Sequence, residues 1–131
     1  MSKIPSEYFI AIEAIIEASK KIMGIYNKAF DVEIKGDGSP LTIADLESSK
    51  IIDAKLKQTD IPITGEETTK DLYKRRKRWE KCWCVDPLDG TKEFISRNGE
   101  FAVNIALVKN QIPIFGLIAS PVQEQILFGD Q

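Results

Sequence analysis

Apolar residues near the start of the chain recur at the spacing of an amphipathic helix. They are Phe9, Ile12, Ile15, Ile16, Ile22, Met23, Tyr26 and Phe30. Residues three and four positions apart share one face of a helix, so this pattern predicts a helix from Ser6 to about Phe30. Ser6, directly after Pro5, is the expected N-cap, and Gly24 is the weakest position of the predicted helix.

A dense turn signal separates this helix from a second one. Residues 36–40 contain two glycines and a proline, which favour a break in regular structure. Residues 42–56 then have the helical spacing again and predict a second amphipathic helix. Its apolar stripe consists of Leu46, Ile51, Ile52 and Leu56.

The rest of the chain favours strands. After Asp60 the apolar segments are short, rich in β-branched residues and separated by turn residues. A short link at residues 110–112 indicates a hairpin between two of the strands. Two helices followed by a run of strands predict an α+β fold, with two helices packed on one face of a largely antiparallel sheet. The predicted strands are residues 61–64, 81–85, 101–109, 113–120 and 125–129.

Composition narrows the possible chemistry. The chain has 131 residues, 43% of them hydrophobic, which suits one domain. It contains no histidine, and this excludes Ser-His-Asp triads, Cys-His pairs and His-ligated zinc. Catalysis therefore depends on carboxylates, hydroxyls, lysines, backbone groups or a hard metal ion.

The charge balance argues against nucleic acid as a partner. The 18 Lys and Arg residues are offset by 20 Asp and Glu residues, for a net charge of −2. A chain without an excess of positive charge is not expected to bind a phosphate backbone. One basic run, residues 74–78, leaves open a nucleic-acid or nuclear-localisation patch, but a solvated loop that attracts an anionic substrate is favoured.

The cysteines and the N-terminus bear on location. Cys82 and Cys84 are one residue apart, which fits neither a redox motif nor half of a zinc site. We expect buried, reduced thiols, which suit the cytoplasm. The N-terminus lacks the layout of a signal peptide, and no apolar run approaches the length of about 20 residues that a membrane span needs. The sequence therefore predicts a soluble, cytoplasmic protein.

The carboxylates concentrate where predicted strands enter loops. After residues 81–85, the side chains of Asp86 and Asp89, the Leu88 carbonyl and the Thr91 hydroxyl offer four oxygen donors within six residues. Such a set is typical of a hard-cation site, and a bound Mg²⁺ would relieve the repulsion between the acids. A plain turn of Asp-Pro and Asp-Gly type remains an alternative, because turns favour the same residues.

Two further acidic positions have competing interpretations. Asp45 lies three residues after Thr42, the spacing of a capping box that starts the second helix. Glu66 and Glu67 follow the first predicted strand, where they either contribute to a metal site or form an exposed acidic turn. Spacing alone favours the structural interpretation of all three residues.

Three segments together resemble a known family. They are residues 39–45 (Ser-Pro-Leu-Thr-Ile-Ala-Asp), residues 65–67 (Gly-Glu-Glu) and residues 83–94 (Trp-Cys-Val-Asp-Pro-Leu-Asp-Gly-Thr-Lys-Glu-Phe). Their order and spacing resemble the signature of the Mg²⁺-dependent, lithium-sensitive phosphatases of the inositol monophosphatase superfamily. Residues 91–107 are similar to the bacterial CysQ type, a 3'(2'),5'-bisphosphate nucleotidase that converts 3'-phosphoadenosine 5'-phosphate to AMP and phosphate in sulfur assimilation and nucleotide recycling. The resemblance implies the N-terminal domain of the layered αβαβα sugar-phosphatase fold.

The resemblance also implies a metal site that holds two or three Mg²⁺ ions in a complete enzyme. Glu66, Asp86 and the Leu88 carbonyl would bind the first ion. Asp86 and Asp89 would bind the second.

The same resemblance assigns catalytic and substrate-binding residues. Asp45 and Thr91 would form the pair that orients and deprotonates the attacking water, with help from Glu66. The backbone amides of Gly90 and Thr91 would bind the scissile phosphate, and Lys35 would approach an outer metal water.

The sequence departs from the family at its end. The family's downstream Trp-Asp motif, whose aspartate completes the second metal site, does not occur, nor do the residues that hold the nucleoside. We therefore expect residues 1–131 to be an N-terminal metal-binding catalytic domain without its C-terminal domain, and the sequence leaves open whether such a fragment is active alone. The alternatives are a sugar phosphatase of the inositol monophosphatase type, or a non-catalytic half-domain that needs a partner chain. The expected partners are a small phosphorylated nucleotide, no nucleic acid and no membrane, together with a complementing C-terminal half or a second copy of the chain.

Overall fold

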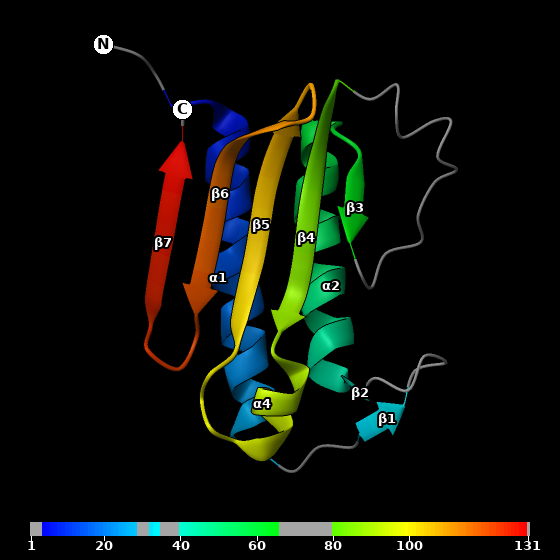
Figure 1. The fold of residues 1–131 in the computed structure, drawn as a ribbon, viewed down its shortest axis with the longest axis vertical. Helices are drawn as coiled ribbons and strands as arrows, with labels where there is room; N and C mark the ends of the chain where they lie inside the picture. Colours follow the sequence, from blue (N-terminus) through cyan, green and yellow to red (C-terminus); the bar gives the residue numbers. More distant parts are fainter. Residues whose placement is uncertain (1–3, 29–31, 35–39, 66–79, 131) are drawn as a thin grey trace.

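Two long helices lie on one face of a five-stranded sheet. The structure is a computed structural model that describes residues 4–28, 32–34, 40–65 and 80–130. Figure 1 shows α1 (Ser6–Tyr26) and α2 (Ile43–Leu56) packed beside each other behind the sheet, with the short α4 (Thr91–Ser96) at one end. A short 3-10 helix, η1 (Lys57–Thr59), follows α2 directly. The predicted α+β architecture is confirmed.

The sheet is antiparallel except at one edge. Its order is β3-β4-β5-β6-β7, and only the β3–β4 pair is parallel. The strands are β3 (Ile63–Gly65), β4 (Lys81–Asp89), β5 (Ala102–Lys109), β6 (Ile112–Ser120) and β7 (Gln125–Asp130). The predicted strands exist, but β4 continues four residues beyond the predicted end at residue 85. A second, two-stranded sheet of β1 (Val32–Ile34) and β2 (Pro40–Thr42) was not predicted, because each strand has only three residues.

The predicted hairpin joins β5 and β6. Asn110 and Gln111 both have positive φ angles, 50° and 69°, as the two central residues of a tight hairpin turn require. Ile112, which the prediction placed in the link, instead begins β6 and pairs with Lys109.

The first helix is shorter than predicted. It ends at Tyr26, where Asn27 is the C-cap, and Phe30 lies outside the described residues. The predicted N-cap is also wrong, because Pro5 occupies that position with extended backbone and Ser6 is already helical. Proline lacks a side-chain acceptor, so this helix begins without a side-chain cap.

The buried face of α1 differs from the predicted apolar stripe. Phe9 is 52% exposed and Ile16 is 37% exposed. The buried side chains are Tyr8, Ala11, Ala14, Ile15, Ala18 and Ile22. Three of these are alanines, whose small side chains allow close helix packing, and at one end Tyr8 stacks on Phe115 with ring centroids 3.9 Å apart.

The second helix begins where the sequence predicted. Thr42 is its N-cap, and Ile52 and Leu56 are fully buried. Leu46, however, is 38% exposed, and the buried face of the first two turns instead carries polar residues, among them Asp45 and Ser48. A polar buried face at the start of a helix indicates specific hydrogen bonds rather than apolar packing.

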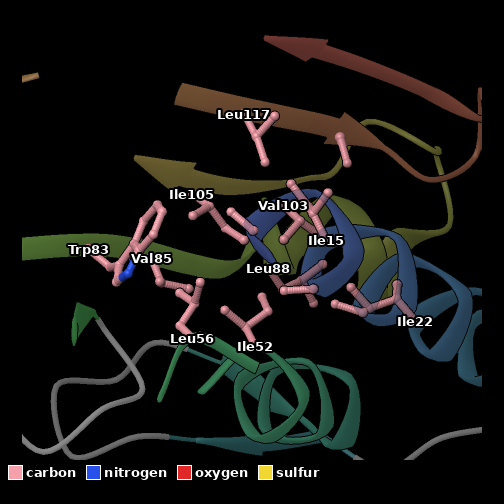
Figure 2. Packing of buried hydrophobic residues seen from close by; sticks show 14 of the residues in the cluster. Ile15, Ile22, Ile52, Leu56, Trp83, Val85, Leu88, Val103, Ile105 and Leu117 are labelled. Carbon is pink, nitrogen blue, oxygen red and sulfur yellow. The ribbon is translucent and has the colours of Figure 1, made fainter. Parts of the chain in front are cut away.

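One continuous core fills the space between the helices and the sheet. Figure 2 shows its apolar side chains converging from both layers; those labelled are Ile15, Ile22, Ile52, Leu56, Trp83, Val85, Leu88, Val103, Ile105 and Leu117. None of the helices in the described part of the chain is long and apolar enough to cross a lipid bilayer.

The cysteines lie on the opposite face of the sheet from this core. Both are free thiols, but Cys82 is half-buried and Cys84 is exposed, so the expected burial is wrong. Side chains alternate along a strand, and Trp83 and Val85 occupy the inner face of β4. The cysteines between them therefore face outward.

Candidate active site at the end of β4

A β-bulge brings two aspartates to the same face of the sheet. Asp86 pairs with Asn104 and Asp89 pairs with Ala102, so β4 has one more residue than β5 between these pairs. Residues three apart on a regular strand point to opposite faces. Here Pro87 and Leu88 are both buried, and Asp86 and Asp89 both lie on the outer side. Asn104 donates a hydrogen bond to Asp89 Oδ2 at 3.2 Å.

A tight turn follows the bulge and starts α4. Gly90 has a φ angle of +91°, which residues other than glycine rarely adopt. An added Cβ would also lie 3.0 Å from the carbonyl oxygen of Glu100. Glycine at this position lets the chain reverse sharply, so that Thr91 becomes the first residue of the helix.

The Asp45 carboxylate connects α2 to this turn. Its Oδ2 accepts a hydrogen bond from the Thr42 amide at 2.9 Å, which is half of the predicted capping box, and a further one from the Thr42 hydroxyl at 2.7 Å. Its Oδ1 accepts a hydrogen bond from the Thr91 hydroxyl at 2.9 Å. Asp45 is 2% exposed. One buried carboxylate therefore caps the helix and also holds Thr91, so the two interpretations of Asp45 are compatible.

A second contact joins α2 to the bulge one turn later. The Ser48 hydroxyl donates a hydrogen bond to the Pro87 carbonyl at 2.7 Å. The next amide, that of Leu88, donates to Asp86 Oδ1 at 3.3 Å. Ser48 was not predicted as a site residue. It lies four positions before Ile52 on the same buried face of α2, and this spacing could have indicated a buried hydroxyl.

The described donors suit a hard cation. Asp86, Asp89 and the Leu88 carbonyl offer only oxygen atoms, the ligands that Mg²⁺ prefers. Within the residues that the structure describes, no three His, Cys, Asp or Glu side chains gather as one metal-binding group. Glu66, Glu67 and Lys35 lie outside the described residues, as does the basic run at residues 74–78.

An apolar groove begins at Asp86 and crosses the outer face of the sheet. Its volume is about 770 Å³. Asp86 and Asn104 line it together with side chains from β6 and β7. Ile118 and Leu127, which pair across β6 and β7 on this face, are large exposed apolar residues, Leu127 by 68%. The site thus opens toward the face of the sheet that α1 and α2 do not cover.

Comparison with known proteins identifies a family for the whole described fold. Residues 5–131 match the inositol monophosphatase family. The chain is 45% identical to the 3'(2'),5'-bisphosphate nucleotidase CysQ of Escherichia coli K12 over 109 residues, which cover 80% of this chain and 44% of that protein. It is 36% identical to CysQ of Haemophilus influenzae over 108 residues, which cover 81% of this chain and 40% of that protein.

Solved structures have the same fold. The crystal structure of CysQ from Bacteroides thetaiotaomicron matches with a TM-score of 0.84 and 46% identity, and the match covers 96% of this chain and 46% of that one. The extragenic suppressor protein suhB from Bartonella henselae matches with a TM-score of 0.86 and 24% identity, over 97% of this chain and 50% of that one. The chain spans about half the length of these relatives, or somewhat less. It belongs to the inositol monophosphatase family, a family of phosphatases that includes the CysQ bisphosphate nucleotidases.

Proposed function

We propose that this chain is the metal-binding catalytic half of a Mg²⁺-dependent phosphomonoester hydrolase. Its substrate is a 3'(2'),5'-bisphosphate nucleotide such as 3'-phosphoadenosine 5'-phosphate, the class named for its CysQ relatives. The observation that carries the proposal is the partly buried hydrogen bond from Thr91 to the buried Asp45 carboxylate, next to the bulge that holds Asp86 and Asp89 on one side of the sheet. A cytoplasmic role in nucleotide recycling for sulfur assimilation is part of the proposal, and the two free cysteines are consistent with a reducing compartment.

The cation site consists of oxygen donors at the end of β4. Asp86, Asp89 and the Leu88 carbonyl would hold the ions, joined by Glu66, which lies outside the described residues. When bound, Mg²⁺ lowers the pKa of the attacking water and offsets the negative charge of the phosphate. The bulge serves this role because it places both aspartates on the outer side.

Asp45 and Thr91 orient and deprotonate the attacking water. The Thr91 hydroxyl donates its proton to Asp45 Oδ1, so a lone pair of its oxygen remains to accept a proton from water. The capping bonds to Oδ2 prevent the carboxylate from rotating, which fixes the position of Thr91 before substrate binds. Phosphate oxygens would bind to the backbone amides of Gly90 and Thr91, and the family resemblance assigns Lys35, outside the described residues, to an outer water of the metal site.

A C-terminal half, corresponding to the part of the relatives that residues 1–131 do not match, completes the proposed enzyme. The relatives are about twice as long as the matched region, and the outer face of the sheet has an apolar groove that starts at Asp86. We propose that residues 1–131 are the N-terminal domain and that a C-terminal half covers this groove, where it contributes the remaining cation donor and the nucleoside contacts.

The test measures phosphate release from 3'-phosphoadenosine 5'-phosphate in Mg²⁺. The chain is assayed alone and mixed with the unmatched second half of the E. coli relative, with and without lithium. We expect lithium-sensitive release only in the mixture, and a higher rate than with inositol monophosphate. Release by the chain alone would refute the need for a second half, and no release from the folded mixture would refute the proposed activity.

Two variants test the proposed role of Thr91. Thr91→Val keeps the shape of the side chain but removes its hydroxyl, so we expect release to fall about 100-fold or more, the range of lost proton-transfer catalysis. Ser96→Ala removes an exposed hydroxyl from the same short helix and should leave the rate unchanged. Equal rates for the two variants would contradict the assignment.

A further inference from the structure

One peptide unit in the bulge is held from both sides. The Pro87 carbonyl accepts a hydrogen bond from Ser48, whose side chain is fully buried (0% exposed). The amide of the same peptide, that of Leu88, donates to Asp86 Oδ1. A chain of two hydrogen bonds therefore runs from α2 through the Pro87–Leu88 peptide to the Asp86 carboxylate.

The sheet itself does not fix this peptide. Regular pairing between β4 and β5 stops at Asp86 and resumes at Asp89, so the bulged residues between them lack ladder partners. Pro87 has no amide hydrogen, so the preceding Asp86–Pro87 peptide also cannot donate a hydrogen bond that would restrain the bulge. The hydroxyl of Ser48 supplies a restraint at the point where the ladder provides none.

We propose that Ser48 is a positioning residue for cation binding. By fixing the plane of the Pro87–Leu88 peptide, it directs the Leu88 amide at Asp86 and sets the direction of the Leu88 carbonyl that follows. It also polarises the peptide, which strengthens the bond from the Leu88 amide to Asp86. This inference rests on the proposed function, because Asp86 and the Leu88 carbonyl are the cation donors in it.

Ser48 acts from the same face of α2 as Asp45. The two residues are three positions apart and thus lie one above the other on the helix. Asp45 holds Thr91 after the bulge, and Ser48 holds Pro87 within it. The first two turns of α2 therefore hold the loop at both ends, and we expect loss of Ser48 to loosen the loop without disturbing the cap.

The adjacent serine provides a matched control. Ser49 is buried to a similar degree, at 6% exposed, on the same helical turn. In the part of the chain that the structure describes, its hydroxyl has no hydrogen bond to β4. Ser48→Ala and Ser49→Ala thus remove the same group from neighbouring positions, while Ser48→Cys keeps a weaker donor in the same place.

The first measurement needs no metal. Hydrogen exchange of the Leu88 amide is followed by NMR in the metal-free 131-residue chain, with the central β5 amide of Ile105 as reference. We expect exchange at Leu88 to be about tenfold faster in Ser48→Ala, intermediate in Ser48→Cys and unchanged in Ser49→Ala, with no change at Ile105.

The second measurement is the affinity for Mn²⁺ and Mg²⁺ by titration calorimetry. Loss of a residue that orients metal ligands typically weakens binding about 10- to 100-fold. We expect a loss of that size in Ser48→Ala, partial recovery in Ser48→Cys and wild-type affinity in Ser49→Ala. Unchanged exchange and unchanged affinity in Ser48→Ala, or equal losses in both alanine variants, would overturn the positioning role alone. If the wild-type chain binds no cation, the proposed metal site fails, and the cation part of this inference fails with it.

Discussion

Replacing Asp45 with asparagine tests the buried contact on which the site depends. The carboxylate accepts three hydrogen bonds, two from Thr42 at Oδ2 and one from Thr91 at Oδ1. Asparagine has one oxygen and one NH₂ group in the same shape, so only one side can keep its acceptor. The Thr42 amide hydrogen cannot turn away, whereas the Thr91 hydroxyl can, so we expect the new NH₂ group of Asp45→Asn to face Thr91.

The cost follows from the change in charge. Hydrogen bonds to charged groups contribute about 1.5–3 kcal/mol, and neutral ones about 0.5–1.5 kcal/mol. The two bonds from Thr42 become neutral, at a cost of about 1 kcal/mol each. The bond to Thr91 reverses direction, because the new NH₂ group donates to the hydroxyl oxygen. We therefore expect Asp45→Asn to lower the free energy of unfolding by about 2 kcal/mol. The Thr91 hydroxyl would also lose the carboxylate oxygen that accepts its proton, which the proposed mechanism requires.

Urea unfolding of the 131-residue chain at pH 7 measures this loss, with the denaturant slope checked for constancy. Glu47→Gln is the matched control, since it removes one negative charge two residues later on the same helix. Glu47 is 29% exposed and its contact is a 3.7 Å ion pair with Lys50, so its loss should cost less than about 0.5 kcal/mol. Equal losses in the two variants would refute the reasoning, because they would attribute the effect of Asp45→Asn to helix charge rather than to the buried hydrogen bonds.

Two further predictions concern β3 and the outer face of β4. Gly65→Ala should lower the free energy of unfolding by about 1–3 kcal/mol, because its Cβ would lie 2.4 Å from the Val85 carbonyl oxygen. Gly24 on α1 lies in open space, so Gly24→Ala should raise the free energy of unfolding by about 0.5–1 kcal/mol. A neutral effect of Gly65→Ala in urea unfolding would contradict this prediction. A hydrogen bond from Cys82 lowers the pKa of Cys84 from 9.0 to about 7, against the raising effect of burial. The rate at which iodoacetamide modifies Cys84 in the metal-free chain should therefore rise with pH, with a midpoint near pH 7. If Cys82→Ala has the same midpoint, the hydrogen bond from Cys82 is not the cause. Since the folded chain then favours the thiolate, the free energy of unfolding should rise between about pH 7 and 9 and lose this contribution as the pH falls through 7.

The features predicted correctly from the sequence are those that depend on residues close together in the chain. The capping box of Thr42 and Asp45 is confirmed because both partners lie within one helical turn. The hairpin is confirmed because two adjacent residues set its turn. The buried face of α1 was predicted wrongly because apolar periodicity gives little weight to alanine, whereas the space between helix and sheet favours it.

The bulge in β4 could not be predicted from neighbouring residues in the sequence. Strict alternation predicts that Asp86 and Asp89 point to opposite faces, and only pairing with β5 shows the extra residue that brings them together. The contacts of Thr91 with Asp45 and of Ser48 with Pro87 join residues 46 and 39 positions apart. The first was expected only from the family resemblance, and the second was not expected at all, because a buried serine in a helix gives no indication of its distant partner.

The two faces of the sheet have different roles in the proposed site. The inner face holds its geometry, since Asp45 and Ser48 contact the loop from α2 and are buried. The outer face carries the proposed cation donors, and Asp86 there lines a groove that continues over apolar residues as far as Leu127. A polypeptide that covers this groove lies against Asp86 by necessity. In the proposed enzyme, burial of the exposed apolar surface and completion of the cation site would thus be one event, with most of its free energy expected from the hydrophobic surface. Cation affinity should accordingly rise when the outer face is covered, while the hydrogen bonds of Asp45 and Ser48 stay as they are.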